Sequence, residues 1–194
     1  MIETALFFGS FNPLHVGHLM VANYIAEYET VDEIWFVLSP HNPLKQSSDL
    51  LDDTLRLDML KLGLAGFPTF KISDIELTLP KPSYTIHTLN TLQNQHPERN
   101  FILLVGADNW LNFHLWKDSE QIISHYPLWI YPRPSYDLPC EQNLPPRVRI
   151  IHSPTFEISS TAIRQAFAQG KNLKAFLPAA VYDFIREKNL YRLN

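Results

Sequence analysis

Short apolar runs alternate with helical patterns along this chain, and this alternation restricts its fold more than any other feature. The apolar runs, each bounded by turn residues, are Thr4–Phe8, Glu33–Leu38, Thr69–Ile72, Phe101–Val105, Leu128–Tyr131 and Val148–Ile151. The helical patterns between them are Gly17–Tyr28, Asp53–Ala65, Thr85–Gln95 and Ser119–His125. Apolar strands separated by helices are typical of a parallel sheet flanked by helices, so we predict an α/β fold.

The last part of the chain changes character and is predicted to be mostly helical from about residue 159. Two helices are expected there, Ser160–Gln169 and Pro178–Glu187, with Gly170 ending the first. Residues 132–146 are rich in proline and predict an irregular surface loop. A length of 194 residues suits one α/β domain and is short for two, so we expect a single domain over residues 1–194.

Composition excludes several classes of protein. A net charge of −4 argues against a nucleic-acid-binding surface. The single cysteine, Cys140, cannot form an internal disulfide or a cysteine-based zinc site, which fits a cytoplasmic protein. No basic-then-apolar signal opens the chain and no apolar stretch has the length of a membrane span, so we expect no membrane association. The composition leaves an oligomer open.

The first strand runs into a turn that carries two histidines. Residues 9–18 read Gly-Ser-Phe-Asn-Pro-Leu-His-Val-Gly-His, and we name this segment the histidine turn. At the start of a helix, free backbone N–H groups and the positive dipole end attract anions, and His15 and His18 add further donors. Surface polar residues or metal ligands are the alternatives for two histidines with this spacing. The surrounding glycines and Pro13 favour a phosphate site, because they permit close backbone approach and fix the turn.

A second polar cluster precedes the predicted helix at residue 160. Ser159, Ser160 and Thr161 stand before an apolar pattern, which is the signature of a helix N-cap and could be no more than that. Arg164 lies one helical turn further on, where it can share a face with the hydroxyl groups. Hydroxyls, N–H groups and a guanidinium would then converge on one phosphate chain.

These two clusters together resemble the nucleotidyltransferase α/β-phosphodiesterase superfamily, through G-S-F-N-P-x-H-x-G-H near the start and I-S-S-T-x-I-R towards the end. The middle of the chain is similar to bacterial nicotinate-nucleotide adenylyltransferases. Their segments are matched by Pro82-Ser83-Tyr84-Thr85 with Thr88-Leu89, by Gly106-Ala107-Asp108 followed by Trp116-Lys117, by Pro43-x-Lys45, by Arg133-Pro134 and by Leu190-Tyr191. The sequence departs from the family pattern at Phe8, Asn12 and Leu44.

The resemblance implies a Rossmann-like fold and the reaction of ATP with nicotinate mononucleotide to give deamido-NAD and pyrophosphate. It implies catalytic roles for His15, His18, Lys45 and Arg164. It implies ATP contacts from Gly9, Ser10, Phe11, His15, His18, Gly106, Asp108, Ser159, Ser160 and Arg164. It implies contacts to nicotinate mononucleotide from Lys45, Tyr84, Thr85 and Trp116. Mg²⁺ is expected as the partner of ATP, held by phosphates and water, because the sequence shows no carboxylate cage for it.

Other readings remain open for individual residues and for the whole chain. Asp108 alone could be a helix N-cap, and Trp116 alone could be a core residue. Rival functions within the superfamily are a phosphopantetheine adenylyltransferase, a cytidylyltransferase, and a dual-specificity or nicotinamide-preferring enzyme. A different class of rival is a nucleotide-binding module that has lost catalysis.

Overall fold

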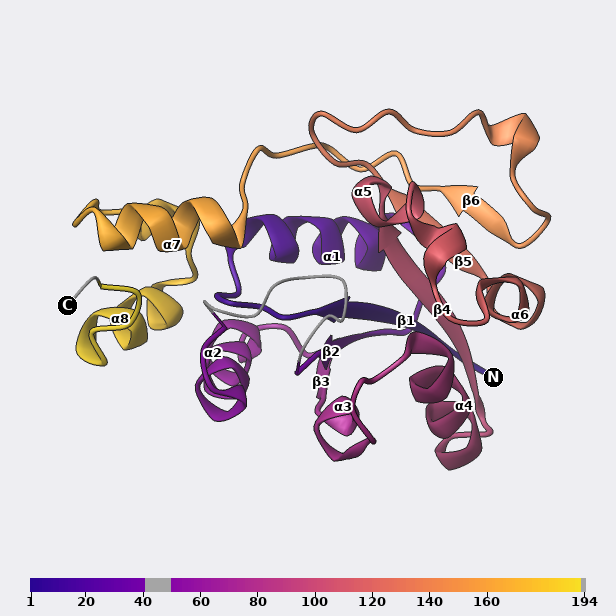
Figure 1. Ribbon diagram of the computed structural model, residues 1–194, viewed down its shortest axis with the longest axis horizontal. Coiled ribbons are helices and arrows are strands. Elements are labelled where there is room, and N and C mark those ends of the chain that lie inside the picture. Colours follow the sequence, from indigo (N-terminus) through magenta and orange to yellow (C-terminus); the bar gives the residue numbers. More distant parts are fainter. Residues whose placement is uncertain (41–49, 193–194) are drawn as a thin grey trace.

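The computed structural model describes residues 1–40 and 50–192, and a parallel sheet forms its centre (Figure 1). Within these residues the sheet has six strands, in the order β3-β2-β1-β4-β5-β6. The strands are β1 (Ile2–Gly9), β2 (Glu33–Leu38), β3 (Phe70–Ser73), β4 (Arg99–Gly106), β5 (Leu128–Tyr131) and β6 (Val148–Ile150). Every adjacent pair is parallel, so the predicted α/β class with a parallel sheet is confirmed.

Helices connect successive strands and form the C-terminal part. The α-helices are α1 (Val16–Tyr28), α2 (Asp53–Leu64), α3 (Ile75–Thr78), α4 (Thr85–Gln95), α5 (Ala107–Trp110), α6 (Ser119–His125), α7 (Ser160–Ala168) and α8 (Ala179–Glu187). Short 3₁₀ helices occur at Phe113–Leu115, Glu141–Asn143 and Lys174–Phe176. None of the helices in the described ranges is long and apolar enough to cross a membrane.

The sheet is buried on both faces, which explains why its strands read as continuous apolar runs. Successive side chains of a strand point to opposite faces. Phe7 therefore joins the cluster packed against α1 and α2, whereas its neighbour Leu6 joins the cluster packed against α4 and α6. Both residues are almost wholly buried.

The strand order reverses between β1 and β4, and this reversal locates the site. β1 ends at Gly9 and β4 ends at Gly106, and the two strands pair side by side. Loops that leave such neighbouring strands in opposite directions open a crevice at the carboxyl edge of the sheet, where α/β proteins bind ligands. The histidine turn and helix α5, which carries Asp108, start at this crevice.

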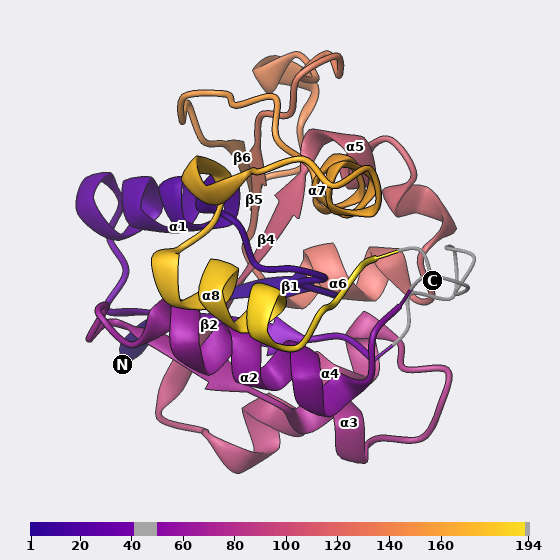
Figure 2. The ribbon, with the colours of Figure 1, turned by 90° about the vertical axis from the view of Figure 1, so that its left-hand side faces the viewer.

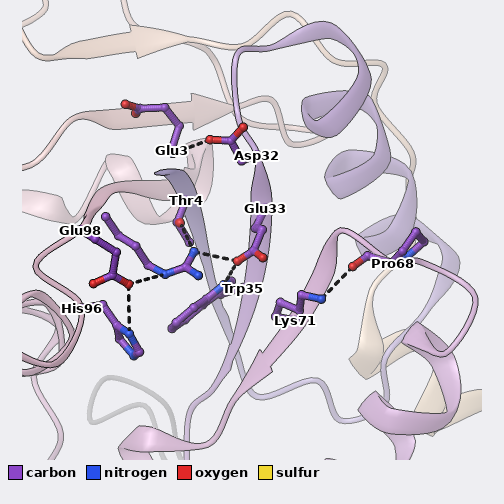
Figure 3. Close-up of polar contacts among 10 residues, drawn as sticks. Glu3, Thr4, Asp32, Glu33, Trp35, Pro68, Lys71, His96 and Glu98 are labelled. Carbon is purple, nitrogen blue, oxygen red and sulfur yellow. Dashed lines mark hydrogen bonds and ion pairs between the residues drawn. The ribbon is translucent and has the colours of Figure 1, made fainter. Parts of the chain in front are cut away.

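A polar network closes the opposite, amino edge of the same strands (Figure 3). The guanidinium of Arg99 donates to the Glu33 carboxylate at 2.7 Å and to the Thr4 hydroxyl at 2.9 Å. The indole N–H of Trp35 donates to the same carboxylate at 2.8 Å. These contacts join β4, β1 and β2, so the network fixes the edge of the sheet that lies away from the crevice.

The C-terminal helices pack together at one end of the molecule (Figures 1 and 2). Ile163 and Phe167 of α7 and Val181 and Ile185 of α8 share an apolar cluster with Met59 of α2. Figure 2 shows α8 lying along α2, so the last helix packs against one of the helices that cover the sheet.

The differences from the sequence-based prediction concern short elements and element ends. α3 and α5 were not predicted, because a single turn of four residues has too little periodicity to recognise. β4 begins two residues before the predicted Phe101, since Arg99 and Asn100 are polar and yet pair with β1. Helix α1 begins at Val16 instead of Gly17. Residues 132–146 form a loop, as predicted, apart from the 3₁₀ turn at Glu141–Asn143.

Candidate active site

A cavity of about 910 Å³ opens at the carboxyl edge of β1 and β4. Most of the residues singled out in the sequence line it: Gly9, Ser10, Phe11, His15, His18, Tyr84, Thr85, Asp108, Trp116, Ser159, Ser160 and Arg164. Gly106 lies behind the wall rather than in it. Lys45 belongs to residues 41–49 and lies outside the described residues.

The histidine turn holds its two imidazoles face to face. The ring centroids of His15 and His18 lie 3.6 Å apart with an interplanar angle of 22°. Gly17 permits this stack, because a Cβ at that position would approach His15 Nδ1 to 3.0 Å. The His18 ring also packs edge-on against Phe11 at 5.2 Å and Phe7 at 6.0 Å. The orientation of His18 is therefore fixed by packing before any ligand arrives.

A backbone hydrogen bond sets the tautomer of His18. The N–H of His15 donates to His18 Nδ1 at 3.2 Å. That nitrogen must be unprotonated to accept, so the neutral His18 ring carries its proton on Nε2. The ring can therefore donate one hydrogen bond from Nε2 to an anion.

Burial holds both imidazoles neutral. Burial, together with the charge of nearby Arg133, lowers the pKa of His15 to about 3. Burial and the charges of His15 and Arg133 lower the pKa of His18 well below its usual range. Near neutral pH the pair therefore offers N–H dipoles rather than positive charges.

This burial predicts that the folded protein loses stability in acid. The unfolded chain protonates His15 near pH 6.5, whereas the folded chain does so only near pH 3. Stability therefore falls as the pH drops through this window, by about 2 kcal/mol at pH 5 for His15 alone. We expect His15→Gln to remove that share of the difference in unfolding free energy between pH 7 and pH 5, measured by urea denaturation. The exposed His125→Gln is the control, and equal pH slopes for wild type and His15→Gln would contradict the prediction.

The predicted N-cap at the start of α7 is confirmed, and the helix is joined to the histidine turn. The Ser159 hydroxyl accepts from the N–H of Ala162 at 3.1 Å. The Ser160 hydroxyl donates to the carbonyl of Pro13 at 3.0 Å, and the Arg164 guanidinium donates to the carbonyl of Asn12 at 3.0 Å. Segments about 150 residues apart in the sequence thus meet at one wall of the cavity.

Arg133 is a cavity residue for which the sequence analysis gave no role. Its guanidinium lies 3.6 Å from the Asp108 carboxylate and donates to the Tyr131 hydroxyl at 3.3 Å. A Cβ at Gly106 would collide with Asp108 and come within 3.2 Å of Arg133, so a glycine is needed behind the pair. Asp108 is not an N-cap, because Gly106 occupies that position and Asp108 stands in the first turn of α5. The one signal in the sequence was the Arg133-Pro134 pair.

The far wall of the cavity is built by the start of α4 and by Trp116. Helix α4 begins at Thr85, and the side chain of its N-cap residue, Tyr84, makes no cap hydrogen bond. Tyr84 and Thr85 line the cavity, so the N-terminal end of α4 lies at this wall. Trp116 is half-buried, lines the cavity and packs against Phe113 with 5.2 Å between ring centroids. Trp116 therefore packs against the core and also lines the cavity. The ammonium of Lys117 lies 4.7 Å above the Tyr84 ring.

Arg56 holds the loops that form the site, and the sequence did not reveal this role. Its side chain is fully buried and donates to the carbonyls of Ser10 at 2.7 Å and Ser39 at 2.8 Å, the residues that follow β1 and β2. It also donates to the carbonyls of Pro40 and Leu51 and pairs with Asp53. The one sequence signal was an arginine within the apolar pattern of α2.

Comparison with known proteins finds solved structures with the same fold as this chain and a family to which its sequence matches. The cytidylyltransferase-like family matches residues 6–166. Two solved structures of Plasmodium falciparum nicotinic acid mononucleotide adenylyltransferase, complexed with NaAD and with APC, superpose with TM-scores of 0.83 and 0.82 at 21% and 20% identity. Each comparison covers 100% of this chain and 99% of the other, and the Rossmann-like fold is thereby confirmed.

Closer relatives are bacterial proteins named "Probable nicotinate-nucleotide adenylyltransferase". The protein of Bacteroides fragilis is 52% identical over 94% of this chain and 90% of its own length. The protein of Flavobacterium johnsoniae is 43% identical over 98% of this chain and 100% of its own. The family matches most of this chain, and the relatives span nearly all of it. The chain therefore belongs to the cytidylyltransferase-like family and, within it, to the nicotinate-nucleotide adenylyltransferases.

Proposed function

We propose that this protein transfers the adenylyl group of ATP to nicotinate mononucleotide, which yields deamido-NAD and pyrophosphate. The observation that carries the proposal is the single cavity that joins the histidine turn and the start of α7 to the wall formed by Thr85 and Trp116. One half has the donors for a triphosphate, and the other has an aromatic ring and the N-terminal end of α4 for a pyridine carboxylate.

The chemistry requires alignment more than it requires a base. A phosphate oxygen of the mononucleotide attacks the α-phosphorus of ATP, and the bond from that phosphorus to the bridging oxygen breaks as pyrophosphate leaves. The nucleophile is already an anion, so no proton has to be removed. The protein has to hold two polyanions in line and stabilise the charge at the α-phosphate.

The described residues supply donors for that task. His18 Nε2–H donates to the α-phosphate, and His15 and Arg164 hold neighbouring phosphate oxygens. Ser159, Ser160 and the backbone of the histidine turn add contacts to ATP. The guanidinium of Arg133, poised between Asp108 and Tyr131, adds positive charge on the same side of the cavity. Lys45 belongs to the proposed phosphate contacts and lies outside the described residues.

Mg²⁺ would arrive with ATP. Among the described residues no group of three carboxylates, histidines or cysteines is placed to hold a metal ion. Asp108 faces Arg133, and Glu76 accepts from the Thr88 hydroxyl at 2.7 Å, so these two cavity carboxylates are engaged with protein groups. The ion would therefore be bound by phosphate oxygens and water, where it neutralises charge on the triphosphate. The single cysteine fits a reducing compartment, and we propose the cytoplasm.

Specificity for nicotinate would come from Thr85 and Trp116. Trp116 stacks on the pyridine ring, and the first N–H groups of α4 donate hydrogen bonds to the carboxylate. A carboxamide would turn its NH₂ group towards those N–H groups and leave them unpaired, which costs binding.

A pyrophosphate-release assay tests the function and separates its rivals. Purified protein receives ATP and Mg²⁺ with nicotinate mononucleotide, nicotinamide mononucleotide or phosphopantetheine, and a parallel set replaces ATP with CTP. We expect release with ATP and nicotinate mononucleotide, and much lower kcat/KM with the other acceptors. Equal kcat/KM for the two mononucleotides would indicate dual specificity. ATP binding with no release for any acceptor would indicate a binding module.

Asp108 provides a prediction for the ATP half of the cavity. We propose that its carboxylate accepts hydrogen bonds from the ribose hydroxyls, and we expect Asp108→Ala to raise the KM for ATP about 10-fold, the value of one charged hydrogen bond. The kcat should change less, because the ribose contact is the same in the ground state and the transition state. Initial rates at varied ATP measure this. Asp108→Asn keeps an acceptor oxygen and should show a smaller effect, and unchanged kinetics in Asp108→Ala would remove the ribose contact.

A further inference from the structure

Tyr191 brings the last described turn of the chain back to the histidine turn. It follows α8, and its hydroxyl donates to Asn12 Oδ1 at 2.7 Å across 179 positions of sequence. Its ring also packs near Phe167 of α7, with 6.4 Å between centroids. The Leu190-Tyr191 pair was recognised in the sequence only as part of a resemblance, and the proposed reaction gives it no role.

Asn12 lies in the cavity wall, close in sequence to the two histidines. It is 2% exposed and precedes His15 by three residues. Two further donors hold the same corner: Arg164 on the Asn12 carbonyl and Ser160 on the Pro13 carbonyl, both at 3.0 Å. The Tyr191 hydroxyl binds the Asn12 side chain, whereas Arg164 and Ser160 bind backbone carbonyls.

The backbone at Tyr191 shows that this contact is maintained against a local preference. Its φ is +62°, in the left-handed region that side chains other than glycine and asparagine seldom adopt. Such conformations persist where the surrounding structure requires them, and they gather near functional sites. Burial raises the pKa of the Tyr191 phenol, so the hydroxyl remains a neutral donor throughout the working pH range.

We propose that Tyr191 is a positioning residue for adenylyl transfer, and that it acts by fixing Asn12 and with it the corner from which His15 and His18 reach the phosphates. This proposal rests on the function proposed above. Without the hydroxyl, Asn12 Oδ1 loses this donor in a buried place, and the turn can relax by the fraction of an ångström that in-line transfer does not tolerate.

Tyr191→Phe tests the proposal, because it removes one oxygen and keeps the ring. We expect kcat to fall about 10-fold, and ATP affinity, measured by calorimetry on the protein alone, to fall several-fold. The KM for nicotinate mononucleotide should stay unchanged, because Tyr191 holds Asn12, whereas Thr85 and Trp116 are carried by α4 and by the end of the 3₁₀ helix Phe113–Leu115. Tyr182→Phe is the matched control, since the Tyr182 ring packs near the same Phe167 at 6.1 Å. It should keep wild-type kinetics, and Tm should be similar in both variants.

A double-mutant cycle with Asn12 separates positioning from a general structural effect. In an Asn12→Ala background, Tyr191→Phe should cause no further loss of kcat or ATP affinity, whereas in an Asn12→Asp background, which keeps an acceptor, its effect should persist. Wild-type kcat in Tyr191→Phe, or a full additional loss beside Asn12→Ala, would overturn the proposal. If the wild type itself fails with nicotinate mononucleotide, the proposed function fails, and the ATP affinities of the same variants still decide the role of Tyr191.

Discussion

Replacing His18 by Ala is expected to lower kcat at least about 100-fold, the typical cost of removing one well-placed donor to a transition state. The reason is the preparation of this ring before substrate binds. Stacking on His15, packing against Phe11 and the hydrogen bond from the His15 N–H hold the ring and leave its proton on Nε2. Because this donor is already oriented, it does not have to reorient as the transition state forms.

Steady-state pyrophosphate release measures this effect, with Tm as a check on folding. His18→Gln keeps an N–H donor and should retain part of the lost activity. The exposed His114→Ala provides a control outside the histidine turn. A decrease in kcat of less than about 10-fold in His18→Ala, equivalent to about 1.4 kcal/mol, would show that His18 does not serve as the main donor to the α-phosphate.

Replacing Arg56 by Met is expected to destabilise the protein by about 3–5 kcal/mol, the usual range when one partner of a buried charge network is removed. The guanidinium is fully buried and holds the carbonyls of Ser10, Ser39, Pro40 and Leu51. Met fills similar space and donates nothing, so these carbonyls and the Asp53 carboxylate would lose their partner.

Urea denaturation gives the free energy of unfolding for this comparison. Lys61→Met is the matched control, because Lys61 lies on the same helix with an exposed side chain, and a change within about 0.5 kcal/mol is expected for a surface site. Arg56→Lys should lie between the two, since an ammonium cannot reach every carbonyl that the planar guanidinium does. A loss below about 1 kcal/mol in Arg56→Met would mean that the carbonyls find other donors, and it would contradict the prediction.

The sequence predicted the layered fold because the two signals that define its elements, hydrophobic periodicity and turn residues, are both local. Runs such as Glu33–Leu38 and Leu128–Tyr131, and the helices Thr85–Gln95 and Ser119–His125, have the bounds that were predicted, because period and turn residues define them. The four-residue helices α3 and α5 were not predicted, because they depend on the strand ends from which they start.

The site divides in the same way between local and distant signals. The residues of the histidine turn and the start of α7 could be singled out, because each forms a compact motif. The contacts of Arg56 with Ser10 and of Tyr191 with Asn12 could not, because the partners lie 46 and 179 positions apart and only the folded chain brings them together. The pairing of Asp108 with Arg133 belongs to the same class.

The bond between Tyr191 and Asn12 also bears on when the protein becomes competent during synthesis. The corner of the histidine turn, at Asn12 and Pro13, is translated at least 147 residues before the side chains that hold it, which stand at positions 160, 164 and 191. Contacts between such distant positions form late, because the intervening chain has to be ordered first. A nascent chain therefore carries both histidines without a finished site until position 191 has been translated and has folded back onto the histidine turn.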